Sequence, residues 1–197
     1  MEIITVKVGI LQTNCYILKQ DGFAVIIDPG AKVQRILDHL GDAKPLAILL
    51  THGHFDHIGA INDLLAVHPL PIYLHPDDEE LLKDPQLNYS FPKRFVVEVE
   101  TLPYPTTLNL GPFSFEIIET PGHTEGSVML KIGDHLFSGD TLFKLSVGRT
   151  DLKTGNPIHM RQSLRQIKTM HGPLTIWPGH DEPTTLADEL RENPYLN

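Results

Sequence analysis

The sequence of 197 residues contains a single cysteine, Cys15, so no internal disulfide bond can form. Cys15 lies in an apolar run, where we expect a small buried side chain rather than a reactive thiol. The apolar runs, such as residues 46–50, are far shorter than the roughly 20 residues that a membrane-spanning helix needs. The N-terminus lacks the basic and then apolar pattern of a secretory leader. These absences predict a soluble cytoplasmic protein that does not bind a membrane.

Positive charge is also scarce. The chain has 16 Lys and Arg against 25 Asp and Glu, which gives a formal net charge of −9. Nucleic acids and acidic membrane surfaces are bound through clustered Lys and Arg, so this balance argues against both as partners. The chain has no low-complexity linker and no short-period repeat, and its length is sufficient for a substantial core. We therefore expect one domain over residues 1–197.

The hydrophobic pattern predicts the order of helices and strands. Strands are predicted at residues 2–8, 14–19, 23–28, 46–50, 71–74, 95–99, 113–118, 127–132, 135–137 and 174–177. Helices are predicted at residues 33–40, 57–67, 77–83, 158–170 and 185–192. Residues 84–105 contain several prolines and are expected to be irregular apart from the strand at 95–99. Because both halves of the chain open with strands, we predict an α+β fold in which two packed mixed sheets carry helices on their outer faces.

The most informative segment is residues 51–57, which places three imidazoles and a carboxylate within seven residues. Imidazole nitrogens and carboxylate oxygens are suitable ligands for zinc, iron or manganese. On an extended backbone His52 and His54 point to the same side, whereas the adjacent Asp56 and His57 point to different places. Such a segment is suited to a pair of metals. The alternative is a His-rich surface loop after a buried strand.

Three later segments repeat one pattern, an apolar strand followed by a glycine and a side chain able to bind a metal. The three pairs are Gly122–His123, Gly139–Asp140 and Gly179–His180. Glycine permits a sharp bend and a close approach of the backbone. Since loops at strand ends gather at active sites, we expect these three side chains to complete the site begun by residues 51–57.

The HxHxDH motif, followed in order by these three residues, resembles the metallo-β-lactamase superfamily in its glyoxalase II branch. The resemblance extends over almost the whole chain and includes residues 28–30, 120–124, 136–143 and 148–151. It implies an αββα sandwich with two divalent metal ions. It also implies that Asp140 bridges the metals together with a water-derived hydroxide. The first metal is then bound by His52, His54 and His123, and the second by Asp56, His57 and His180.

The all-nitrogen and oxygen ligand set allows zinc, iron or manganese. Zinc is favoured by the Irving–Williams order and by the hydrolytic resemblance. Asp140 is not a cysteine, unlike the thiolate ligand of some zinc β-lactamases. His54 is not a glutamate, which separates the chain from the diiron flavoprotein oxidoreductases. Asp28 is a candidate for orienting a ligand, with a plain turn residue as the alternative.

Two metals at such a site lower the pKa of bound water toward about 7 and polarise a carbonyl, so the predicted reaction is acyl transfer to water. Asp140 and Asp56 are the expected catalytic carboxylates. The resemblance implies a hydroxyacyl-glutathione thioester, of the S-lactoylglutathione type, as substrate. Arg149 stands where the family places a basic residue that contacts substrate, although an ordinary structural arginine fits equally well. Asp151 stands where the family has a tyrosine.

The chain ends at Asn197 without the helical C-terminal domain of longer glyoxalase II enzymes, so it resembles the short, single-domain subgroup. Two alternatives use the same motifs. A persulfide dioxygenase of the superfamily would bind one iron through His52, His123 and Asp140. A lactonase or other ester hydrolase would use the same dinuclear site.

Overall fold

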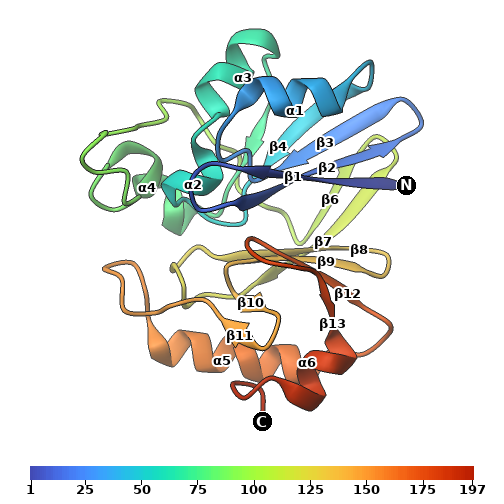
Figure 1. The fold of residues 1–197 in the computed structure, drawn as a ribbon, viewed down its shortest axis with the longest axis vertical. Coiled ribbons are helices and arrows are strands. Elements are labelled where there is room, and N and C mark those ends of the chain that lie inside the picture. The colour runs from blue at the N-terminus through green and yellow to red at the C-terminus, as the bar shows by residue number, and fades with distance from the viewer.

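The computed structural model describes residues 1–197, and Figure 1 shows two sheets in the centre with helices on both outer sides. The N-terminal sheet has five strands in the order β1-β2-β3-β4-β5. Its first three strands are antiparallel, and β4 and β5 continue in parallel pairing. The bounds are β1 Glu2–Val8, β2 Thr13–Gln20, β3 Phe23–Ile27, β4 Lys44–Leu49 and β5 Ile72–Tyr73.

The C-terminal sheet has six strands in the order β13-β12-β9-β8-β7-β6, and a separate hairpin joins β10 to β11. All its pairs are antiparallel except β12 with β9. Consequently β7, β9 and β12 run in the same direction, and their carboxyl ends share one edge of the sheet. The bounds are β6 Thr107–Leu110, β7 Phe113–Glu119, β8 Val128–Ile132, β9 His135–Gly139, β10 Leu142–Phe143, β11 Ser146–Val147, β12 Thr175–Pro178 and β13 Thr184–Thr185.

Helices cover the outer face of each sheet. On the N-terminal side, α1 and α3 lie above the sheet, and on the C-terminal side α5 and α6 lie below it (Figure 1). This arrangement confirms the predicted α+β sandwich with helices outside. The bounds are α1 Val33–Leu40, α2 Phe55–Ile58, α3 Ile61–Val67, the 3-10 turn η1 Pro76–Asp78, α4 Glu79–Lys83, α5 Pro157–Lys168 and α6 Leu186–Glu192.

The central strands β2, β3, β8 and β9 are buried on both faces, and β2 shows how the sequence achieves this. Ile17 packs in the hydrophobic cluster under α1 and α3, whereas Tyr16 and Leu18 pack in the cluster between the two sheets. Alternate side chains of a strand point to opposite faces, so a continuous apolar run serves both layers. Cys15 is fully buried, and burial raises the pKa of its thiol, which confirms the expected inert core cysteine.

The predicted helix over 57–67 is wrong in one respect, because the structure divides it into α2 and α3. The Ala60 N–H donates to the carbonyl of Pro29 instead of continuing the helix. Gly59 also lies so close to the carbonyl of Gly30 that a side chain there would collide with it. The break therefore results from contact with the loop that follows β3.

The predicted strand at 95–99 is also wrong. The N–H of Val97 donates to the carbonyl of Leu82 at the end of α4, so this segment pairs with a helix end rather than a strand. Its apolar side chains are explained by the core, since Val97 is fully buried in the cluster under α1 and α3. The short strands β6, β10, β11 and β13 carry too few residues for their alternation to predict them.

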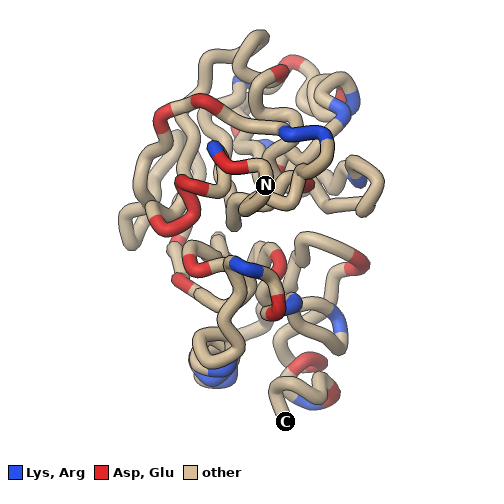
Figure 2. Tube along the Cα trace, turned by 90° about the vertical axis from the view of Figure 1, so that its left-hand side faces the viewer, with Lys and Arg blue, Asp and Glu red and all other residues tan.

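None of the helices combines the length and the apolar character that crossing a bilayer requires. Figure 2 shows Lys and Arg in separate short stretches of the chain, with Asp and Glu between them.

Candidate metal centre

Seven side chains converge where the N-terminal segment 52–57 meets the carboxyl ends of the C-terminal strands. Segment 52–57 follows β4 and enters α2. The loops after β7, β9 and β12 supply one side chain each, and the shared direction of these strands brings the loops to the same edge. The seven residues are His52, His54, Asp56, His57, His123, Asp140 and His180.

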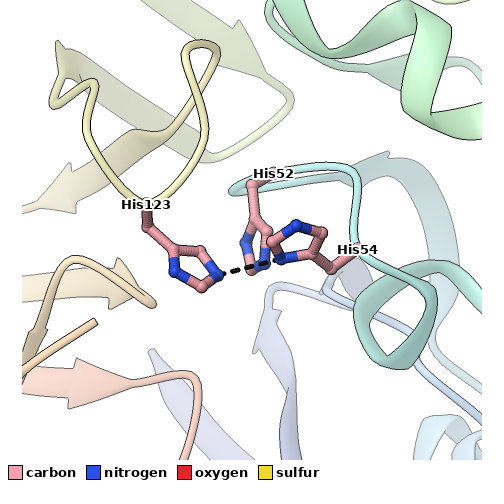
Figure 3. A group of neighbouring side chains, drawn as sticks. All are labelled: His52, His54 and His123. Atoms are coloured by element: carbon pink, nitrogen blue, oxygen red, sulfur yellow. Dashed lines mark hydrogen bonds between the residues drawn. The ribbon is translucent and has the colours of Figure 1, made fainter. Parts of the chain in front are cut away.

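The first group consists of His52, His54 and His123, whose ligand-competent nitrogens lie within 4.8 Å of one another (Figure 3). His54 Nδ1 lies 2.9 Å from His123 Nε2. The backbone of His54 is extended, which places it on the same side as His52, as the alternation predicted. Burial lowers the pKa of His54 to about 3 and also lowers that of His52. Both imidazoles are therefore neutral at pH 7, the form that binds a metal.

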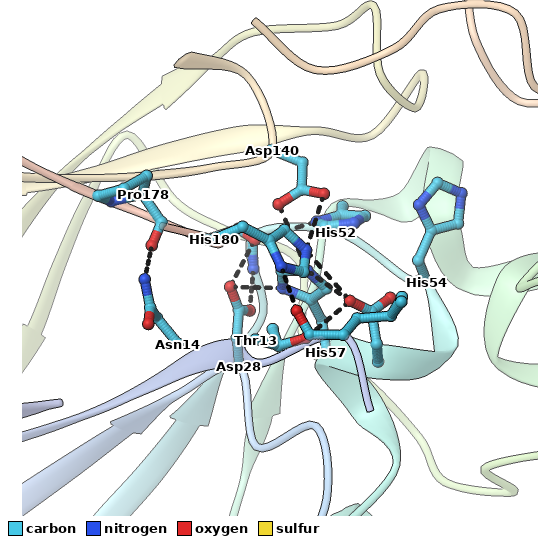
Figure 4. Close-up of polar contacts among 12 residues, drawn as sticks. Thr13, Asn14, Asp28, His52, His54, His57, Asp140, Pro178 and His180 are labelled. Atoms are coloured by element: carbon cyan, nitrogen blue, oxygen red, sulfur yellow. Dashed lines mark hydrogen bonds and ion pairs between the residues drawn. The ribbon is translucent and has the colours of Figure 1, made fainter. Parts of the chain in front are cut away.

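The second group consists of Asp56, His57 and His180, whose ligand atoms again lie within 4.8 Å of one another. Figure 4 shows His57 and His180 of this group together with Asp140. His180 Nε2 lies 3.2 Å and His57 Nε2 3.5 Å from Asp56 Oδ2. The prediction that Asp56 and His57 point to different places is wrong, because both lie in the helical turn α2 rather than on extended backbone. In that turn the two side chains lie in one group with His180.

Asp140 lies between the two groups. Its Oδ2 atom is 3.5 Å from His123 Nε2 and 3.4 Å from His180 Nε2. Its Oδ1 atom is 3.4 Å from His57 Nε2. One carboxylate thus faces side chains of both groups.

The carboxylates of the site are ionised. Burial alone would raise the pKa of Asp56, but the charge of His57 and the hydrogen bond from His180 lower it to about 2. The same balance, dominated on the lowering side by His57, holds the pKa of Asp140 well below its usual range. Burial lowers the pKa of His180, yet its hydrogen bonds to Asp140 and Asp56 raise it to about 10. A cation that binds the second group therefore displaces a proton from an imidazole.

Several buried polar atoms of the site have no hydrogen-bond partner. They are His52 Nε2, His57 Nε2 and Asp140 Oδ1, and these three residues also lie within 4.8 Å of one another. A buried polar atom without a partner is costly, so native structures normally pair it. Nitrogen and oxygen donors that converge without partners fit bound divalent cations. The chemistry of this donor set therefore matches a metal centre.

Other buried side chains hold the second group in place. Asp28 Oδ2 lies 3.0 Å from His57 Nδ1, and the same carboxylate accepts hydrogen bonds from the N–H and Oγ1 of Thr51. Thr13 Oγ1 donates to Asp56 Oδ2 at 2.8 Å. Such contacts fix the orientation of ligand side chains. Asp28 was a candidate from the sequence, whereas Thr13 lies 43 residues from Asp56 and has no signal of its own.

The loop that carries His180 is tied to the N-terminal sheet. The N–H of Asn14 donates to the carbonyl of Gly179 at 2.7 Å, and its Nδ2 donates to that of Pro178 at 2.9 Å (Figure 4). A Cβ at Gly179 would collide with Asp140 Oδ1 and approach His57 Cε1 to 2.8 Å. The close backbone approach that the sequence predicted for this glycine is confirmed.

A cavity of about 420 Å³ opens onto the two groups. Phe55, Tyr89, Phe143 and Leu152 provide much of its apolar wall. Tyr89 was not singled out in the sequence, because it lies in the irregular segment 84–105.

Arg149 also lines the cavity, but its guanidinium faces Asp151, to which it makes two hydrogen bonds of 2.7 Å in an exposed ion pair. The backbone of Arg149 has a contact that the sequence did not predict. Its carbonyl lies 2.9 Å from His123 Nδ1, which favours the tautomer that leaves Nε2 directed at the first group.

The other six histidines belong to neither group.

The sequence profile described as the Metallo-beta-lactamase superfamily matches residues 8–180. The chain belongs to this superfamily. The "Probable metallo-hydrolase YqgX" of Bacillus subtilis (strain 168) is 38% identical over 96% of this chain and 95% of its own length. The "Hydroxyacylglutathione hydrolase GloC" of Haemophilus influenzae is 30% identical over 100% of this chain and 99% of its own length.

Solved structures of other proteins share the fold. BLEG-1, described as a B3 metallo-beta-lactamase, superposes with a TM-score of 0.93 at 36% identity and covers 100% of both chains. TTHA1623 in a di-iron-bound form gives 0.88 at 36% identity, covering 98% of this chain and 100% of its own. ETHE1 from Myxococcus xanthus gives 0.80 at 26% identity, covering 98% and 84%.

Proposed function

We propose that this chain is a dinuclear metal-dependent hydrolase that cleaves a glutathione-linked hydroxyacyl thioester, as glyoxalase II enzymes do. The observation that carries the proposal is the position of Asp140, whose carboxylate lies within 3.5 Å of nitrogens in both histidine-containing groups. The GloC relative supports the substrate class, since its similarity covers the whole chain. We further propose that residues 1–197 act as one hydrolase domain on a small-molecule substrate.

We propose a specific role for each residue of the site. His52, His54 and His123 would hold one cation, Asp56, His57 and His180 would hold the other, and Asp140 would contact both. Bound divalent cations supply an acidified water and polarise the substrate carbonyl. Thr13 fixes Asp56 Oδ2 by a hydrogen bond, so this carboxylate is placed to accept a hydrogen bond from the attacking water and orient it. We propose zinc as the metal, with iron or manganese as alternatives; TTHA1623 was solved with two irons.

In this proposal, the side chains of the cavity wall position the substrate. The apolar part of the wall would shield the reacting carbonyl from bulk water through Phe55, Phe143 and Leu152. Arg149 is the substrate-binding cation in this proposal. It would pair with a glutathione carboxylate by exchanging its exposed partner Asp151, because exposed ion pairs contribute little stability.

The alternative of a mono-iron persulfide dioxygenase needs only His52, His123 and Asp140. The second group would then have no ligand role, although the ligand atoms of Asp56, His57 and His180 converge within 4.8 Å of one another. This observation favours the hydrolase. Lactone, ester and β-lactam substrates use the same carbonyl chemistry, and the BLEG-1 similarity justifies including a β-lactam in the test.

The experiment combines metal analysis with a substrate panel. Freshly purified protein is assayed for thiol release from S-lactoylglutathione, for oxygen uptake with glutathione persulfide, and for hydrolysis of a lactone and of nitrocefin. Two metal equivalents with thiol release support the proposal. One iron with oxygen uptake contradicts it, as does two-metal protein that hydrolyses only the lactone or the β-lactam. Asp140→Ala is the negative control for every assay.

A further inference from the structure

Four acidic residues of the chain are buried: Asp28, Asp56, Asp78 and Glu189. Asp28 and Asp56 belong to the metal centre described above. Asp78, at the junction of η1 and α4, is 0% exposed and has no role in the proposed reaction. A carboxylate is rarely buried without strong partners, so its contacts indicate why it is there.

Asp78 accepts three hydrogen bonds from the two loops that carry the first group. Its Oδ2 atom accepts from the N–H of Gly53 at 2.9 Å and from Thr124 Oγ1 at 2.8 Å. Its Oδ1 atom accepts from the N–H of Gly126 at 2.9 Å. Gly53 separates His52 from His54, and Thr124 directly follows His123. One carboxylate thus links the loop that carries His52 and His54 to the loop that carries His123.

The packing around these contacts leaves no room for a larger residue at Gly53 or Gly126. A Cβ at Gly126 would lie 2.7 Å from Asp78 Oδ1, and a Cβ at Gly53 would lie 2.7 Å from Leu81 Cβ in α4. The two glycines allow their N–H groups to approach the carboxylate directly. Because all three partners are donors, the position requires a group that only accepts, and a carboxylate meets this requirement where an amide does not.

We propose that Asp78 is a positioning residue for the first metal, which holds the His52–His54 loop and the His123 loop at the separation their shared cation requires. The inference rests on the proposed metal centre. Partners of this kind typically change metal affinity by about 10- to 100-fold when they are removed. Asp78 makes no contact with the second group, so the effect should be confined to the first site.

The test measures metal binding rather than turnover. Chelator-treated protein is titrated with Zn²⁺ in competition with a chromophoric chelator, in a His180→Ala background that weakens the second site. We expect Asp78→Asn to lower the affinity of the remaining site by about 10- to 100-fold. Asn keeps the size of the side chain but presents an N–H group to at least one donor.

The matched control is Glu189→Gln. Glu189 is also 0% exposed and also accepts three hydrogen bonds, from Thr184 Oγ1, the N–H of Leu145 and Asn193 Nδ2. This variant should lower the melting temperature without changing Zn²⁺ affinity. The comparison therefore separates a role in positioning the first-group histidines from a general loss of stability.

If Asp78→Asn does not fold, Thr124→Val is tested in its place. This variant removes a single donor to the Asp78 carboxylate with little change in the shape of the side chain. We expect a loss of affinity of about 2- to 10-fold. Unchanged affinity in a folded Asp78→Asn variant overturns the inference, and so does unchanged affinity in Thr124→Val if the first variant is unfolded. An equal loss in Glu189→Gln overturns it as well. Failure of the unsubstituted protein to bind two equivalents would instead refute the proposed metal centre.

Discussion

The two halves of the molecule build their shares of the site in different ways. The N-terminal half contributes four residues from one continuous segment, 52–57, whose loop and helical turn set their relative positions locally. The C-terminal half contributes His123, Asp140 and His180 from three separate loops, each after a different strand. The relative positions of these three residues depend on strand pairing and on the glycine that precedes each of them. The positions of the four N-terminal residues are therefore set locally, whereas the positions of the three C-terminal residues depend on the pairing of the whole sheet.

The largest effect is expected for Asp140→Ala, which removes the one C-terminal side chain that faces both groups. Both metals should be lost together, and thioester hydrolysis should fall by more than about 100-fold, beyond the range for supporting contacts. Elemental analysis after gel filtration measures the loss. Retention of two full equivalents would show that the two groups bind metal independently of Asp140.

Gly179→Ala tests how strongly the C-terminal share depends on backbone approach. The added methyl group would collide with Asp140 Oδ1 and crowd His57, so metal binding should weaken at both sites. Forcing an additional methyl group into a packed region typically costs about 1–3 kcal/mol of stability. Thermal unfolding with and without added Zn²⁺ measures both consequences. A variant with unchanged melting temperature and metal content would contradict the close approach.

His180→Ala should separate the groups, because His180 approaches Asp56 and Asp140 but belongs only to the second group. We expect about one metal equivalent to remain, held by His52, His54 and His123. The matched variant, His52→Ala, should retain metal at the second group instead. Metal content and the stoichiometry of Zn²⁺ titration provide the readout. Loss of both equivalents in His180→Ala would mean that the two groups do not bind metal independently.

The smallest effect is expected for Asp151→Asn, which releases Arg149 from an exposed ion pair at the cavity wall. The freed guanidinium should bind a glutathione carboxylate more readily, so KM for S-lactoylglutathione should fall, by less than about tenfold, while kcat is unchanged. Arg149→Gln, the opposing control, should raise KM. An unchanged KM in both variants would remove Arg149 from the substrate-binding surface.

The same division explains how far the sequence allows prediction. The layered fold follows from apolar central strands that are buried on both faces, and the predicted fold is confirmed. The HxHxDH segment drew attention because its chemistry is contiguous, and the three Gly-preceded turns because each ends an apolar strand. The sequence thus predicts that all seven side chains lie close together, as they do in the structure. Their roles as metal ligands stay a prediction until a metal is measured.

The directions of Asp56 and His57 were mispredicted because a helical turn replaces extended backbone there. The other errors and omissions have a common cause, which is contact between segments distant in the sequence. The break between α2 and α3 arises from the Pro29–Gly30 loop, and residues 95–99 pair with the end of α4. Thr13 reaches Asp56 across 43 residues, and Asp78 reaches Gly126 across 48. Asp78 lies in the acidic run 77–80, which carries no motif. Local periodicity contains no information on these contacts.

The most direct test of the shared centre is the metal stoichiometry of the unsubstituted protein. Chelator-treated protein is titrated with Zn²⁺ while bound metal and thiol release from S-lactoylglutathione are followed together. The account predicts saturation at two equivalents per chain, with full activity reached only when both are bound. Saturation at one equivalent, with activity already maximal or absent, would contradict it.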